Sequence, residues 1–181
     1  MAVFRLIAVS AFAVLSGGCI VVSLQPAYTD DAIVFEEGLI GQWESLEDRT
    51  SATIDRAEWR TYRIVYTDRS TTLSFDGNLT RIGERLFLDL TQVRGIDEGP
   101  YLVPVHGVYR IELEADTLCA SALDYQWFTR AMARKRIASL IPAFDGRRNL
   151  TLAAASGPLR EWLARAPEGA FTAPVTFTRK R

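Results

Sequence analysis

The sequence is poor in the residue types that most often carry out catalysis or bind metals. It contains one histidine, His106, and two cysteines, Cys19 and Cys119. A zinc site needs several ligands at a regular spacing, and no such spacing occurs here. A glycine-rich phosphate-binding loop is also missing. Any Ser–His or Cys–His mechanism would need His106 as its base. We therefore expect no enzymatic activity, no metal and no cofactor.

The few residues that resemble catalytic groups have simpler interpretations. His106 shares its side of a predicted strand with Arg110 and Glu112, so we expect it to face solvent. Asp89 lies on the polar side of another strand together with Arg85. That spacing predicts a surface ion pair rather than an acid or base.

The chain also lacks a strong excess of charge of either sign. It carries 21 basic and 22 acidic residues, for a net charge of −1. A nucleic-acid-binding protein needs a basic surface, so this class is not expected. The apolar fraction of 48% over 181 residues is typical of one globular domain with a buried core.

A short apolar run opens the chain. Arg5 is the only charged residue before Asp30, and Leu6 to Leu15 form an apolar stretch. A membrane-spanning helix needs about 20 apolar residues, which is more than this stretch provides. Leu15-Ser16-Gly17-Gly18-Cys19 closes the run with small residues. A positive, apolar and then small-residue order is typical of a secretory signal peptide.

This ending resembles the processing site of bacterial lipoproteins. The resemblance implies that residues 1–18 are a signal peptide and that Cys19 becomes a lipidated N-terminus carrying palmitate or a similar chain. In such lipoproteins an aspartate directly after the cysteine often signals retention in the inner membrane. Ile20 at this position therefore implies the outer membrane, facing the periplasm. Residues 19–38 would form a lipidated tether and entry turn before a single domain at 39–181. The alternatives are an uncleaved anchor and a buried strand from Gly18 to Leu24. Cys119 would have no intramolecular partner, and we expect it to be buried.

The rest of the sequence consists mainly of short segments whose alternation is typical of β-strands. Gly83-Glu84 predicts a tight hairpin turn. Asp124 is placed to cap a helix running to Arg136, and a second helix begins at Ser156-Gly157-Pro158. The expected strands are 39–46, 59–67, 71–82, 85–94, 101–113, 117–123, 149–155 and 175–179. This spacing predicts a mainly β fold, an antiparallel up-and-down barrel of about eight strands with two inserted helices. A β-sandwich is the alternative.

Gly41-Gln42-Trp43 opens the first expected strand of this domain. It resembles the Gly-x-Trp motif of lipocalins and related calycin-like barrels. In that family the tryptophan closes one end of the barrel, and a late arginine packs across its ring. The resemblance implies a lipocalin-like barrel in which Gly41, Trp43 and Arg179 form this closure. A cation on an indole face is a favourable contact.

The inward side of the expected strands is apolar. Its members are Leu73, Phe75, Leu79, Leu86, Leu88, Leu90, Tyr109 and Ile111. In a closed barrel this side either encloses a ligand or packs as a solid core. The first case predicts an envelope lipoprotein that binds a hydrophobic or amphipathic small molecule. The second predicts an envelope scaffold or assembly factor that binds protein partners, with Trp59, Tyr62 and Trp127 as candidate exposed aromatics.

A basic cluster follows the first expected helix. It consists of Arg130, Arg134, Lys135 and Arg136. An amphipathic helix with a basic end can lie against anionic lipid headgroups, so these residues are candidates for a membrane surface. The alternative is a solvated surface cluster without a binding role, because cations at a helix C-terminus are favoured by the helix dipole.

Overall fold

A computed structural model describes residues 20–93, 103–145 and 149–180 of the chain. The expected signal peptide at 1–18 and the expected lipidation site Cys19 lie outside the described residues. None of the described helices is long and apolar enough to cross a membrane.

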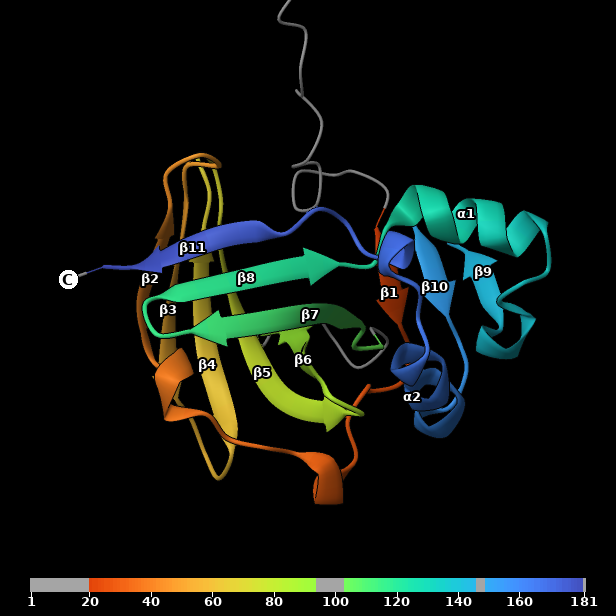
Figure 1. The fold of residues 1–181 in the computed structure, drawn as a ribbon, viewed down its shortest axis with the longest axis horizontal. Coiled ribbons are helices and arrows are strands. Elements are labelled where there is room, and N and C mark those ends of the chain that lie inside the picture. Colours follow the sequence, from red (N-terminus) through yellow and green to blue (C-terminus); the bar gives the residue numbers. More distant parts are fainter. Residues whose placement is uncertain (1–19, 94–102, 146–148, 181) are drawn as a thin grey trace, which may run out of the picture.

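Eight antiparallel strands close into a barrel (Figure 1). Consecutive strands pair from β2 to β8, and β11 lies between β8 and β2 and completes the ring. The strands are β2 (Gly41–Ser45), β3 (Thr50–Arg56), β4 (Thr61–Thr67), β5 (Thr72–Ile82), β6 (Arg85–Gln92), β7 (His106–Glu114), β8 (Thr117–Ala122) and β11 (Val175–Arg179). The predicted mainly β barrel with two inserted helices is confirmed, and the alternative β-sandwich is wrong.

Alternation of side chains gives the barrel its core. In β4, Tyr62, Ile64 and Tyr66 are buried in the barrel while Arg63 is exposed. The expected hairpin at Gly83-Glu84 joins β5 to β6, and Ile82 pairs with Arg85 across it. Gly83 has a φ of 61°, a conformation in which glycine has no steric penalty.

The expected strand set contains one error in each direction. The segment Thr50–Arg56 was not expected, yet it forms β3 between β2 and β4. The segment 149–155 was expected in the barrel, but only β10 (Leu150–Leu152) forms there, and it lies outside the ring. The barrel therefore has the expected eight strands, but β3 is one of them in place of the segment 149–155.

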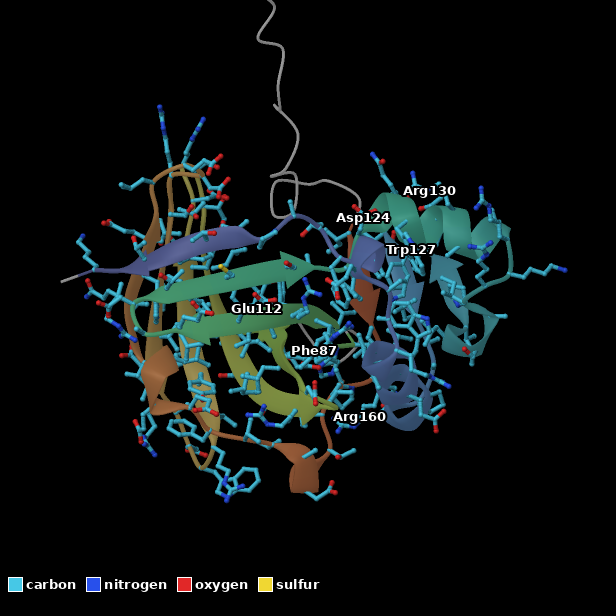
Figure 2. The ribbon with its side chains drawn as sticks, viewed as in Figure 1. Phe87, Glu112, Asp124, Trp127, Arg130 and Arg160 are labelled. Atoms are coloured by element: carbon cyan, nitrogen blue, oxygen red, sulfur yellow. The ribbon has the colours of Figure 1, made fainter. Side chains whose placement is uncertain are left out.

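A second layer covers part of the outside of the barrel (Figures 1 and 2). It contains β1 (Val21–Ser23), α1 (Tyr125–Ala133), β9 (Pro142–Phe144), β10 and α2 (Ser156–Ala164). β1 pairs in parallel with β10, and its Ser23 pairs with His106 of β7. The described residues also form the 3-10 helices η1 (Asp30–Ala32), η2 (Glu37–Leu39), η4 (Ala138–Leu140) and η5 (Glu168–Ala170), of which η2 leads into β2 of the barrel.

This second layer has its own hydrophobic core. Phe87 and Val108 point outward from β6 and β7 and pack with Phe128, Leu159 and Leu163 of the two helices. The helices form largely where expected, although α1 ends at Ala133 rather than at Arg136. The Asp124 carboxylate accepts a hydrogen bond from the Trp127 backbone N–H and so caps α1.

The segment expected to be a tether and entry turn packs on the domain from Ile20 onward. The Ile20 backbone N–H donates to Asn149 Oδ1 at 3.3 Å, and its carbonyl accepts from the Leu150 N–H at 2.8 Å. Ala27 and Ile33 are buried. Arg160 of α2 donates to the Ala27 carbonyl at 2.8 Å and holds this segment against the barrel.

One end of the barrel is closed by Trp43 and Arg179. The Arg179 guanidinium lies 4.3 Å from the centroid of the Trp43 ring, and Trp43 Nε1 donates to the Leu39 carbonyl at 2.9 Å. Gly41 has a φ of 145°, and a Cβ there would collide with the Arg179 guanidinium. This arrangement is compatible with a lipocalin-like barrel.

Candidate functional site

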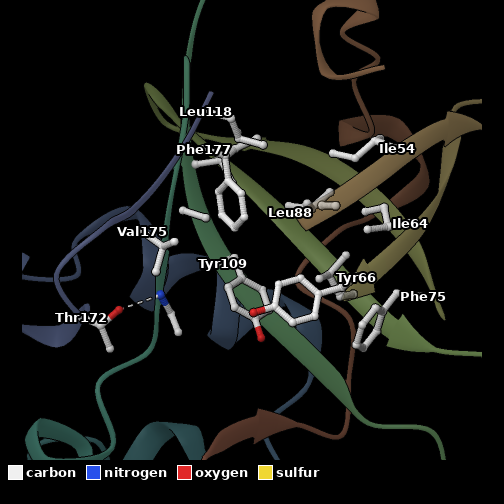
Figure 3. A pocket seen from close by; sticks show the side chains of 15 residues that line it. Ile54, Ile64, Tyr66, Phe75, Leu88, Tyr109, Leu118, Thr172, Val175 and Phe177 are labelled. Atoms are coloured by element: carbon white, nitrogen blue, oxygen red, sulfur yellow. Dashed lines mark hydrogen bonds between the residues drawn. The ribbon is translucent and has the colours of Figure 1, made fainter. Parts of the chain in front are cut away.

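A cavity of about 120 Å³ lies inside the barrel (Figure 3). The cavity lies toward the end of the barrel opposite Trp43. We call this end the upper end; β2, β4, β6 and β8 finish there, and β3, β5, β7 and β11 begin there. Fifteen residues line the cavity: Ala52, Ile54, Ile64, Tyr66, Phe75, Leu88, Leu90, Tyr109, Ile111, Leu118, Ala120, Ala122, Thr172, Val175 and Phe177. None of these described side chains carries a charge at neutral pH.

Small side chains leave this space unfilled. Ala120 and Ala122 face inward from β8, where they pair with Ile111 and Tyr109, and Ala52 faces inward from β3. At the opposite end, Trp43, Leu39 and other large residues fill the interior. The barrel thus combines a packed half with a half that contains a cavity.

The interior residues expected from the sequence divide between these halves. Phe75, Leu88, Leu90, Tyr109 and Ile111 line the cavity. Leu79 and Leu86 belong to the core of the same barrel without lining the cavity, and Leu73 lies near the start of β5, half-buried.

Most residues that line the cavity belong to strands whose inward-facing side chains were not predicted from the sequence. The contributions of β3, β4, β8 and β11, together with Thr172, were not predicted. The alternation of Tyr62, Ile64 and Tyr66 was a usable signal for β4. Thr172 had no signal, because it lies in the segment that returns from the second layer to β11.

The polar groups of the cavity are hydroxyls. Tyr66 is 9% exposed, and its Oη has no hydrogen-bond partner. Tyr109 extends into the same space, and its hydroxyl points toward the part of the cavity that the Tyr66 hydroxyl faces (Figure 3). Thr172 Oγ1 accepts a hydrogen bond from the Ala122 N–H at 3.1 Å, so its own proton remains to be donated.

Both tyrosines stay protonated at neutral pH. Burial raises the pKa of Tyr66 to about 12, although the nearby Thr50 hydroxyl opposes part of this increase. Burial also raises the pKa of Tyr109. The phenols are therefore hydrogen-bond donors in the cavity rather than anions.

Asp89 and His106 lie outside the barrel wall but not in solvent, contrary to expectation. Asp89 is 0% exposed, and its carboxylate accepts from the Ala27 N–H at 2.7 Å and pairs with His106 Nδ1 at 2.7 Å. Arg85, the expected partner of Asp89, instead pairs with Glu168. The Asp89–His106 pair is covered by the segment that contains Ala27.

The basic cluster lies on the outer side of the second layer. Arg130 projects from α1 away from the molecule (Figure 2), and all four residues of the cluster are exposed. Arg134, Lys135 and Arg136 follow the end of the helix. None of the four forms an ion pair with a described residue.

Two of the three candidate exposed aromatics are not exposed. Tyr62 is fully buried and exchanges hydrogen bonds with the Glu36 backbone. Trp127 packs against Phe128 and Trp162 beneath α1. Trp59 alone is exposed, at 62%.

The remaining sequence expectations concern Cys119 and metals. Cys119 is only half-buried and lies beside Thr176 on the outer side of β8 and β11. The described residues contain no group of three or more metal-ligating side chains. Comparisons of the chain with protein-family models, curated proteins and solved structures found no match.

Proposed function

We propose that the barrel binds a small hydrophobic or amphipathic molecule without transforming it. The observation that carries this proposal is the apolar cavity, together with a buried hydroxyl that has no partner in the protein. Sites for small ligands combine an apolar lining with a few polar groups that orient the ligand. Protein cores contain few voids larger than a water molecule, so an apolar cavity of about 120 Å³ supports a binding role.

The protein is further proposed to be a lipoprotein of the bacterial cell envelope. The support is the signal-like leader that ends in Cys19, and Ile20 after it favours the outer membrane facing the periplasm. Because Ile20 is already bonded to Asn149, a lipid on Cys19 would hold the folded domain close to the membrane. In Figure 1, β1 begins on the side of the molecule where α1 lies, and the β2–β3 and β4–β5 hairpins point to the same side.

The membrane partner has a second proposed contact in the basic cluster. Arg130, Arg134, Lys135 and Arg136 are exposed and free of ion pairs with described residues, so their charge is available to anionic headgroups. Replacing all four with glutamine in a Cys19→Ser chain is expected to reduce binding to anionic vesicles. Vesicles of zwitterionic lipid are the control. Equal binding of both chains to anionic vesicles would show that the cluster is an ordinary solvated surface.

Lipidation is tested on the full chain expressed in a bacterium. The wild-type protein is expected to incorporate labelled palmitate and to fractionate with membranes, whereas Cys19→Ser is expected to do neither. A wild-type protein that retains Met1 and incorporates no label would contradict the lipoprotein assignment. That result would leave ligand binding by the barrel untouched.

Ligand binding is tested by native mass spectrometry of the purified full chain, followed by extraction of any small molecule. We expect a stoichiometric bound molecule in the wild-type protein and its loss in Ala120→Leu, whose added carbons fill the cavity. Ala133→Leu makes the same change on the exposed side of α1 and is expected to keep the molecule. A ligand-free wild-type mass, with no thermal shift on adding small apolar molecules, would oppose the proposal.

The second candidate function is an envelope scaffold that binds a protein partner. One observation favours it: Ile141 and Phe144 are 60% and 48% exposed at β9, the edge strand of the second layer. An exposed edge strand can pair with another chain. A ligand-free barrel together with a defined envelope partner lost on Phe144→Lys would support this alternative.

A further inference from the structure

The upper end of the cavity presents hydrogen-bond donors that the protein itself does not use. Tyr66 Oη is buried and makes no hydrogen bond within 3.5 Å, and the nearby Thr50 hydroxyl, which lies outside the cavity lining, is likewise without a bond. The Tyr109 hydroxyl forms no hydrogen bond with a described residue, and the two phenols lie close enough to interact electrostatically. A buried hydroxyl without a partner is costly, and a bound acceptor would remove that cost.

The charge around these hydroxyls limits what they can bind. The described lining contains no lysine, arginine or histidine, and the two tyrosines are its only titratable groups. A carboxylate in this space would lose its hydration without gaining a cation, which is strongly unfavourable. A ligand with a neutral oxygen avoids this penalty and accepts from the phenols.

The volume limits the ligand further. An apolar cavity of about 150 Å³ is known to hold benzene, so a cavity of about 120 Å³ has room for no more than one small ring or a short branched chain. A long acyl chain would fill this volume with only a part of its length.

We propose that the cavity takes a compact, uncharged, largely apolar molecule whose single oxygen accepts hydrogen bonds from Tyr66 and Tyr109. This inference rests on the proposed binding function and specifies its ligand class. The ligand class includes alcohols, ethers and ketones and excludes fatty acids and other apolar anions.

Three probes of nearly equal shape separate these classes: toluene, benzyl alcohol and benzoate. Their binding to the full chain is measured by calorimetry and by ligand-observed NMR. We expect benzyl alcohol to bind about tenfold more tightly than toluene, the equivalent of about 1.4 kcal/mol from hydrogen bonding. Benzoate is expected to bind more weakly than either.

Two variants assign the effect to the phenols. Tyr66→Phe and Tyr109→Phe are each expected to weaken benzyl alcohol binding by about three- to tenfold while leaving toluene binding unchanged. Tyr28→Phe removes a hydroxyl outside the cavity lining and serves as the matched control. Melting temperatures of the three variants establish that each is folded.

The outcomes separate the two levels of the proposal. If toluene and benzyl alcohol bind equally in all variants, the barrel binds ligands but the phenols do not select them. If benzoate binds most tightly, the assignment to uncharged ligands is wrong. If no probe binds and the wild-type chain carries no molecule, the proposed function itself fails.

Discussion

Removing the Asp89 carboxylate tests whether the second layer depends on one buried polar contact. Asp89 is 0% exposed and receives hydrogen bonds from the Ala27 N–H and from His106 Nδ1, each at 2.7 Å. These contacts join β6 and β7 of the barrel to the segment that follows β1. Asp89→Ala would leave the Ala27 N–H buried without an acceptor, and His106 Nδ1 would keep only its longer contact with Thr91 Oγ1 at 3.3 Å.

The expected cost follows from these contacts. The unsatisfied Ala27 N–H costs about 1–3 kcal/mol and the lost hydrogen bond to His106 adds about 1–2 kcal/mol, so Asp89→Ala loses about 2–5 kcal/mol. Relief of the buried charge offsets part of this, which gives a net loss of about 3 kcal/mol. Asp89→Asn keeps an acceptor for Ala27 and allows a neutral His106 to accept from the new amide. We therefore expect a loss of only about 1 kcal/mol for Asp89→Asn.

Urea unfolding followed by tryptophan fluorescence measures both variants. For a chain of this length, a loss of about 3 kcal/mol also lowers the melting temperature by about 6–12 °C. Asp76→Ala is the matched control, because Asp76 forms an exposed ion pair with Arg63 at 2.9 Å and such pairs contribute about 1 kcal/mol or less. If Asp89→Ala unfolds at the same urea concentration as Asp76→Ala, the buried carboxylate does not hold the two layers together.

Three further predictions concern the barrel. Gly41→Ala is expected to destabilise the protein by roughly 1–3 kcal/mol, because residue 41 has a φ of 145° and the new Cβ would meet the Arg179 guanidinium. An unchanged urea midpoint would contradict the close packing of Gly41 against Arg179. Tyr66→Phe is expected to raise the melting temperature of the ligand-free protein, since it removes a buried hydroxyl that has no partner; calorimetry that shows a lower temperature would indicate that the hydroxyl is satisfied. Burial raises the pKa of Tyr62 and of Tyr66 to about 12, so the folded state holds these protons more tightly than an unfolded chain with a tyrosine pKa near 10. The contribution of these two tyrosines to stability is complete below pH 10 and is lost as the pH rises toward 12. Urea unfolding measured at increasing alkaline pH, with phenolate absorbance recorded alongside, is expected to show the urea midpoint falling over this range.

The sequence predicted the barrel well wherever strands alternate clearly. The apolar alternation of β5 and β6 identified their inward faces, and the hairpin residues Gly83-Glu84 identified their connection. β3 was missed because Ser51, Thr53 and Asp55 are exposed or half-exposed and its inward residues include the small Ala52. β10 was placed in the barrel because alternation identifies a strand without identifying its neighbour.

The environment of Asp89 was mispredicted for a different reason. Alternation separates the inside of a barrel from its outside, and Asp89 and His106 were correctly on the outside. The outside of β6 and β7 is covered here by a second layer, so outward side chains are buried. Phe87 and Val108 share that outward side and are buried with it, and their apolar character was the available signal.

The cavity and the second layer share a structural boundary. The insertion that carries both helices leaves the barrel at Ala122 and returns at Thr172, and these two cavity-lining residues are joined by a hydrogen bond of 3.1 Å. Leu123 and Phe171 form the next bridge outward, and the Asp124 N–H donates to the Ala170 carbonyl at 2.8 Å. The base of the insertion is therefore also a wall of the cavity.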